Sequence, residues 1–124
     1  GALMDWHELP SAPVRGSCLG WRDDIPEGGG REVAFGEGKD AFRVLLLRRG
    51  EKVWGYLNVC PHFSIPLNYE PQKFLTFDGE ALMCAHHTAF FRFEDGQCFD
   101  GPCEGARLTP VEITVAATGE IRIA

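Results

Sequence analysis

Two short groups of cysteine and histidine stand out in this sequence as residues that could carry chemistry. Cys60 and His62 form a C-x-H pair, and Cys84 and His87 form a C-x-x-H pair. Thiolate sulfur selects iron–sulfur clusters, zinc or copper(I), and imidazole suits zinc and iron. Held side by side, the two pairs would offer two thiolates and two imidazoles to one metal centre.

Both pairs follow directly on segments with the composition of a β-strand. Residues 53–59, rich in β-branched and aromatic side chains, lead to Cys60, and residues 81–83 lead to Cys84. Taken singly, a cysteine is usually a small buried apolar residue, and a histidine is usually a surface or hydrogen-bonded one. Two mixed pairs, each at the end of a strand, instead favour a metal site.

The remaining pattern predicts an all-β domain, because no long window shows a helical period of apolar side chains. In the first predicted strand, Phe42, Val44 and Leu46 lie on one face and Arg43 lies on the other. The first third of the chain is predicted to be rich in loops, because residues 9–13 and 26–30 have turn or linker compositions. The predicted strands are two hairpins, 41–49 with 53–59 and 111–115 with 121–123, and three shorter strands at 74–76, 81–83 and 89–93.

Length and composition narrow the class of protein. The 124 residues fit a single domain spanning 1–124, and 44% hydrophobic with 24% charged residues excludes general disorder. With 12 basic against 18 acidic residues, the net charge of −6 makes nucleic acid a poor partner. No apolar run approaches the roughly 20 residues of a membrane span, and no secretory signal opens the sequence. We therefore expect a cytoplasmic protein without membrane contact, and we interpret residues 1–3, ahead of Met4, as a vector remnant.

The five cysteines are an odd number, so they cannot all pair within one chain. In a reducing compartment, cysteines more often bind metal or remain thiols than form disulfides. Cys98 and Cys103 flank a Gly-Pro turn, and a disulfide between them is left open. Cys18, in the first third of the chain, is expected to be a buried thiol.

Two other chemistries compete for the same cysteines and histidines. A zinc site would make the chain a zinc-stabilised binding module, but zinc modules usually open with two cysteines and close with two histidines, whereas each pair here is mixed. A hydrolase using Cys60 or Cys84 as its nucleophile lacks a nameable residue to orient the histidine. Iron, sulfide and zinc contents separate these alternatives from an iron–sulfur protein.

Together, the two pairs resemble the ligand motif of Rieske [2Fe–2S] domains, C-x-H followed by C-x-x-H. A third segment, Asp-Gly-Pro-Cys-Glu-Gly at 100–105, resembles the proline loop that covers the cluster in that family. The resemblance is specific over residues 52–124. It implies an all-β, Rieske-like fold of three small antiparallel sheets, with the cluster held at one tip by binding loops 60–67 and 84–91.

By the same resemblance, Cys60 and Cys84 would bind one iron of a single [2Fe–2S] cluster, and His62 and His87 would bind the other. The implied function is that of a soluble Rieske-type ferredoxin, a one-electron carrier that passes electrons from a reductase to a terminal enzyme such as an oxygenase. A small Rieske subunit of a larger oxidoreductase, for example a nitrite reductase, is the alternative within electron transfer. His7 is the only histidine outside the two groups, too few for the 2-His-1-carboxylate iron site of a complete oxygenase, so no catalytic residue is assigned.

The chain also departs from the high-potential Rieske proteins of respiratory complexes. Where those proteins carry two further cysteines joined as a disulfide, this chain has Ile65 and His86. Where they place Ser and Tyr hydroxyl groups toward the cluster and its ligand sulfur, it has Ala89 and Phe91. Because fewer hydrogen-bond donors stabilise the added electron, we expect a reduction potential at the low end of the Rieske range of roughly −150 to +300 mV.

Overall fold

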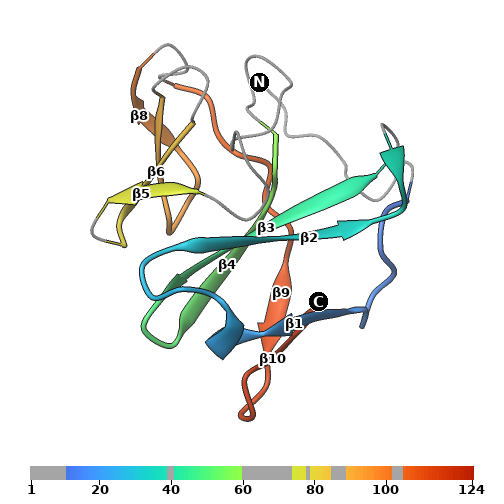
Figure 1. Cartoon of the computed structure of the whole chain (residues 1–124). Helices are drawn as coiled ribbons and strands as arrows, with labels where there is room; N and C mark the ends of the chain where they lie inside the picture. Colours follow the sequence, from blue (N-terminus) through green and yellow to red (C-terminus); the bar gives the residue numbers. More distant parts are fainter. Residues whose placement is uncertain (1–10, 39–40, 60–73, 78, 85–88, 102–104) are drawn as a thin grey trace.

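The computed structural model describes residues 11–38, 41–59, 74–77, 79–84, 89–101 and 105–124. These residues form three antiparallel sheets and one short 3-10 helix, η2 (Arg22–Asp24) (Figure 1). The first sheet has the order β1 (Cys18–Trp21), β10 (Glu120–Ile123), β9 (Ile113–Val115). The second has the order β2 (Gly30–Phe35), β3 (Phe42–Arg49), β4 (Lys52–Leu57). The third has the order β5 (Leu75–Phe77), β6 (Ala81–Met83), β7 (Phe90–Arg92), β8 (Cys98–Asp100).

The predicted all-β class, the three antiparallel sheets and both predicted hairpins are confirmed. β3 and β4 pair from Val44 opposite Leu57 to Arg49 opposite Lys52, and β9 and β10 pair in the same antiparallel manner. Gly50, with φ of +63°, supplies the left-handed backbone of the turn between β3 and β4. The three shorter predicted strands are present as β5, β6 and β7, each within one residue of its predicted bounds.

β1, β2 and β8 were not predicted from the sequence, and β1 and β2 lie within the loop-rich first third of the chain. The register of β1 shifts between Cys18 and Gly20, and β2 contains Gly30 and two charged residues. Neither strand shows the clean alternation that marks a strand in sequence. Their conformation comes from the neighbours they pair with, β10 for β1 and β3 for β2.

β3 is buried on both faces, which the alternation seen in the sequence did not indicate. Val44, Leu45, Leu46 and Leu47 each expose no more than 1% of their surface. Leu45 and Leu47 pack with the third sheet, whereas Val44 and Leu46 pack with the first. A strand covered on both faces needs apolar residues at consecutive positions, and the run from Val44 to Leu47 provides them.

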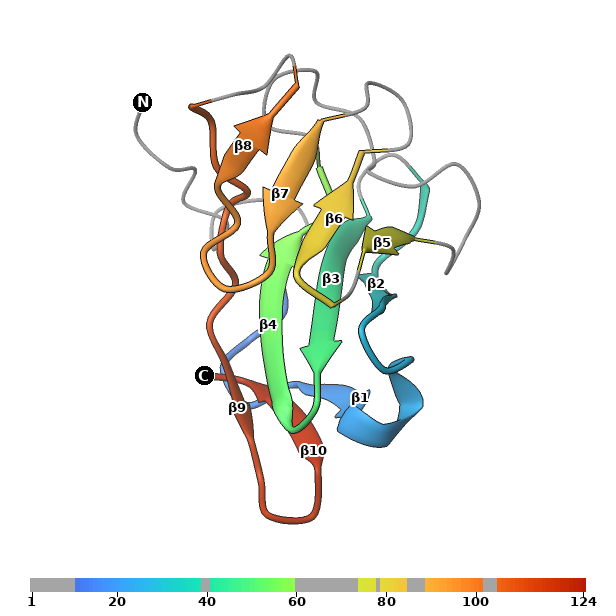
Figure 2. The ribbon, with the colours of Figure 1, turned by 90° about the vertical axis from the view of Figure 1, so that its left-hand side faces the viewer.

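The second sheet therefore lies between two separate cores. Figures 1 and 2 show β3 and β4 running between the third sheet at one end of the molecule and the first sheet at the other. We call the core shared with the third sheet the site-side core; its buried members are Leu45, Leu47, Tyr56, Leu82, Cys84, Ala89, Phe91, Phe93, Cys98 and Leu108. We call the other the terminal core; its buried members are Leu19, Ile25, Phe42, Val44, Leu46, Leu57, Val111, Ile121 and Ile123.

Replacing Leu45 or Leu46 by alanine is expected to lower the free energy of unfolding by about 2–5 kcal/mol in each case, because each truncation leaves a cavity in one of the two cores. Urea denaturation followed by circular dichroism measures the loss. Thr114→Ala, on an exposed position of β9, is the control and should change stability by less than about 0.5 kcal/mol. A loss for Leu45→Ala no larger than that of the control would mean that only one face of β3 is buried.

Candidate metal centre

The strands that precede the three segments singled out in the sequence all end at the same end of the molecule. β4, β6 and β8 run toward the top of Figures 1 and 2, and β7 begins there. β4 leads to the C-x-H pair, β6 leads to the C-x-x-H pair, and β8 leads to residues 102–104. The strand directions therefore fit a site assembled from all three segments.

Of the four predicted ligands, the structure describes Cys84. Cys60, His62 and His87 lie outside the described residues, as does His86. The placement of the complete ligand set therefore stays a prediction. The described residues that flank these positions can be examined directly.

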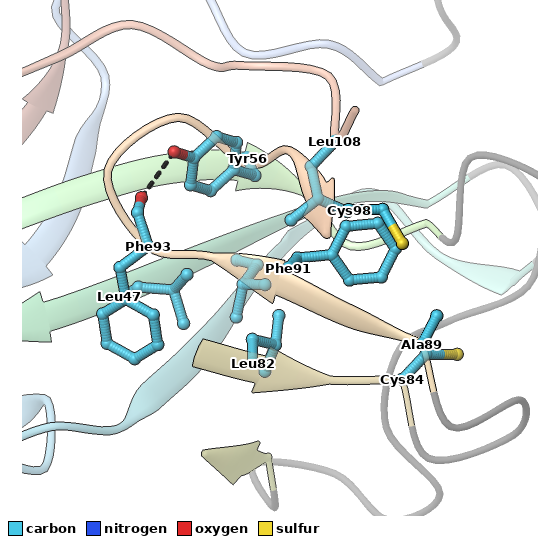
Figure 3. Close-up of a cluster of buried hydrophobic side chains, with 10 residues drawn as sticks. Leu47, Tyr56, Leu82, Cys84, Ala89, Phe91, Phe93, Cys98 and Leu108 are labelled. Carbon is cyan, nitrogen blue, oxygen red and sulfur yellow. Dashed lines mark hydrogen bonds between the residues drawn. The ribbon is translucent and has the colours of Figure 1, made fainter. Parts of the chain in front are cut away.

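Cys84 lies immediately after β6 and is fully buried. Its backbone N–H donates to the carbonyl oxygen of Ala89 at 2.8 Å, which ties together the two ends of segment 85–88. Figure 3 shows Cys84 and Ala89 at the edge of the site-side core, with the cysteine sulfur directed away from Leu82 and Phe93. A sulfur shielded from water and held on a fixed backbone suits a cluster ligand, because the apolar shell around a metal site limits solvent access.

Ala89 and Phe91 are also fully buried, and both belong to the site-side core (Figure 3). These are the positions at which the sequence lacks the hydroxyl groups of the respiratory Rieske proteins. Their side chains contribute packing and offer no hydrogen-bond donor. This arrangement is consistent with the expected low reduction potential.

A buried hydrogen bond joins the second sheet to the turn that follows β7. The Tyr56 hydroxyl donates to the Phe93 carbonyl oxygen at 2.6 Å, and Tyr56 is only 3% exposed (Figure 3). Burial is the main cause that raises the pKa of Tyr56 well above its usual range, with a smaller contribution from Asp95. Tyr56 therefore remains a neutral donor at any physiological pH and holds the two sheets in one arrangement.

The chain just before Cys60 is held by a side-chain contact that was not predicted. Asn58 is fully buried at the end of β4, and its Nδ2 donates to Oε2 of Glu32 on β2. The sequence signal is a polar residue directly after an apolar strand, which by itself is also typical of a loop. Only the pairing of β2 with β3 brings Glu32 within reach of Asn58.

Two cysteines outside the ligand set have definite environments. Cys18 is exposed on β1, with its sulfur 3.7 Å from Oε2 of Glu120, so the expectation of a buried thiol is wrong. The next residue, Leu19, faces the terminal core, so Cys18 lies on the opposite, exposed face of β1. The sulfur of Cys98 donates to the carbonyl oxygen of Asp100 at 3.2 Å. Cys103 lies outside the described residues, so the question of its disulfide with Cys98 stays open.

No helix among the described residues is long and apolar enough to cross a membrane. Within the same ranges, no group of three or more Cys, His, Asp or Glu side chains lies together as a second metal site.

Comparison with protein families identifies the family of this chain. The Rieske [2Fe–2S] domain matches residues 17–117. The chain therefore belongs to the Rieske [2Fe–2S] domain family, whose domain binds one [2Fe–2S] cluster, and the family resemblance seen in the sequence is confirmed. No sequence among the curated proteins matches the chain.

Solved structures with the same fold include proteins of carbazole dioxygenase systems. The ferredoxin of carbazole 1,9a-dioxygenase from Nocardioides aromaticivorans IC177 is 25% identical, with a TM-score of 0.62, and the match covers 90% of this chain and 96% of that one. The terminal oxygenase of the same system is 20% identical, with a TM-score of 0.69. That match covers 88% of this chain and 30% of the oxygenase, so this chain spans about a third of the oxygenase length. A reduced complex of oxygenase and ferredoxin in carbazole 1,9a-dioxygenase matches at 18% identity with a TM-score of 0.69, covering 88% of this chain and 28% of that one.

The low-potential expectation can be tested at Ala89. Ala89→Ser is expected to raise the reduction potential by about 40 mV, because a hydroxyl donor that stabilises the reduced state by about 1 kcal/mol shifts a one-electron couple by that amount. A spectroelectrochemical titration at pH 7 measures the shift. Ala116→Ser, at an exposed position after β9, is the control and should leave the potential unchanged. A clearly positive midpoint for the wild-type protein, or equal shifts in both variants, would contradict the expectation.

Proposed function

We propose that this protein is a one-electron carrier, a Rieske-type ferredoxin that accepts electrons from a reductase and passes them to a terminal oxidoreductase such as an oxygenase. The observation that carries the proposal is the match to a ferredoxin over 90% of this chain and 96% of that one. The match to the terminal oxygenase, in contrast, covers only 30% of the oxygenase chain. The fold alone serves both kinds of protein, so the extent of the match favours the carrier.

In this proposal, the [2Fe–2S] cluster is held by Cys60, Cys84, His62 and His87, with the two cysteines on one iron and the two histidines on the other. Bound there, the cluster takes up and releases one electron at a potential raised by its neutral histidine ligands. The protein contributes the fixed strand ends around it: Cys84 is buried and tied to Ala89, and the site-side core packs beneath. A rigid surround suits electron transfer, because little has to rearrange when the charge changes.

The proposed partners and cellular location follow from charge and composition. A net charge of −6 favours partners with a basic docking surface and argues against nucleic acid. We propose a soluble, cytoplasmic component without catalytic residues of its own and without membrane contact. The second candidate is a small Rieske subunit of a larger oxidoreductase, which the shared fold also allows and which would co-purify stably with a large subunit.

Metal analysis tests the cluster and its ligands. The protein purified without exposure to oxygen should contain about two iron and two labile sulfide per chain and give a Rieske-type EPR signal after reduction with dithionite. Alanine replacement of Cys60, His62, Cys84 or His87 should abolish the signal, because each removes one of four ligands.

Two variants at a histidine and a cysteine outside the ligand set are the matched controls. His86→Ala removes a histidine next to a proposed ligand, and Cys18→Ala removes an exposed cysteine far in the sequence from all four proposed ligands. Both variants should retain the iron and the EPR signal. One zinc and no labile sulfide per wild-type chain would refute the proposal in favour of a zinc-stabilised module.

The charge argument predicts a salt dependence of electron transfer to the physiological partner. The second-order rate constant between the reduced protein and its acceptor should fall as sodium chloride is raised from about 0.05 M to 0.5 M, because salt screens the attraction between an acidic and a basic surface. Stopped-flow spectroscopy of cluster oxidation measures it. A rate constant that is unchanged or rises with salt would show that the acidic surface does not guide docking.

A further inference from the structure

The end of β4 is held by a buried polar network that neither the ligand motif nor the family match assigns. Asn58 is the one fully buried polar side chain in the described part of the chain. Its Nδ2 donates to Oε2 of Glu32 on β2. Glu32 exposes only 9% of its side chain and accepts a second hydrogen bond, 2.8 Å long, from Nη1 of Arg43 on β3. The network thus crosses all three strands of the second sheet.

The backbone around Asn58 is fixed as firmly as its side chain. The Asn58 N–H donates to the carbonyl oxygen of Arg43 at 2.9 Å, and the Val59 N–H turns back to the carbonyl oxygen of Leu57, also at 2.9 Å. On the other side, the Leu57 N–H donates to the carbonyl oxygen of Thr109 at 2.9 Å. These bonds define the direction in which the chain leaves β4.

A buried amide at this position is not explained by packing alone. Taking an amide out of water costs free energy unless both its donor and acceptor groups find partners, and an apolar side chain would avoid that cost. Buried polar groups that are bonded in this way are directional, and they select one local arrangement over its alternatives. Asn58 is therefore suited to fixing the conformation of the chain where it leaves β4.

We propose that Asn58 is a positioning residue, held by Glu32, that sets the exit of the chain from β4 and thereby the placement of Cys60 and His62. The inference rests on the ligand assignment in the proposed function. Cys84 is fixed separately, through its bond to Ala89, the residue just before β7 of the third sheet. Loss of the Asn58–Glu32 bond would therefore disturb one half of the ligand set and leave the other half in place.

The test uses the full-length holoprotein and the variants Asn58→Ala and Glu32→Ala. Three quantities are measured: the EPR g-values of the reduced protein, the midpoint potential, and the rate at which cluster absorption is lost at pH 7. We expect altered g-values, a shifted midpoint and at least an approximately fivefold faster loss of absorption in both variants, the factor that corresponds to one lost hydrogen bond. In the double variant, the effects should not add, because both changes remove the same contact.

Two further variants separate positioning from general stability. Glu32→Gln keeps an acceptor oxygen for Asn58 and loses only the charge facing Arg43, so it should retain the wild-type g-values. Ile121→Val truncates a fully buried residue of the terminal core, so it should lower the melting temperature without changing g-values or midpoint. Should Glu32→Ala fail to fold, Glu32→Asp decides, because it keeps the charge and withdraws the carboxylate by one methylene.

The outcomes distinguish this inference from the proposed function. Wild-type g-values and midpoint in Asn58→Ala and in the deciding Glu32 variant, with only a lower melting temperature, would overturn the positioning role and leave the electron-carrier proposal intact. Equal spectral changes in Ile121→Val would overturn it as well. Absence of the Rieske-type signal from the wild-type protein would overturn both.

Discussion

The burial of β3 on both faces is the constraint on which the rest of this structure depends. One face of the strand completes the site-side core and the other completes the terminal core. Its two edges are also occupied, by β2 and β4. A shift of β3 by one residue would move the side chains of each face into the other core. The register of β3 is therefore fixed, and it fixes the registers of the strands that pair with it. The position of the end of β4 follows from that register.

The candidate centre draws on two different sheets, so it depends on how firmly those sheets are joined. The first pair of proposed ligands follows β4 of the second sheet, and the second pair follows β6 of the third. The site-side core joins these sheets, and the bond from Tyr56 to the Phe93 carbonyl reinforces the joint (Figure 3). Close to each ligand pair, a further hydrogen bond holds the chain: Asn58 donates to Glu32 before the first pair, and Cys84 donates to Ala89 at the second. Strand ends held in this way by two joined sheets fit the proposed electron-transfer site, in which little should rearrange on reduction.

Similarity to both a ferredoxin and a terminal oxygenase shows how one fold serves two arrangements. In the oxygenase, the matched part is about 30% of the chain, whereas in the ferredoxin it is nearly the whole. The fold alone therefore does not decide which of the two roles a chain has.

The sequence by itself determined the family, the all-β class and the ligand candidates, because each can be recognised from residues that are close together in the chain. These local patterns are the two Cys/His pairs, the period-2 alternation, and turn residues such as Gly50. Tertiary structure alone decided that Leu45 and Leu47 are buried as well as Val44 and Leu46. It also decided that residues 18–21 and 30–35 are strands and that Cys18 is exposed. The contact between Asn58 and Glu32 joins residues 26 positions apart in the chain. Burial on a second face, pairing of irregular strands and contacts across a sheet are set by distant neighbours, which local sequence patterns do not record.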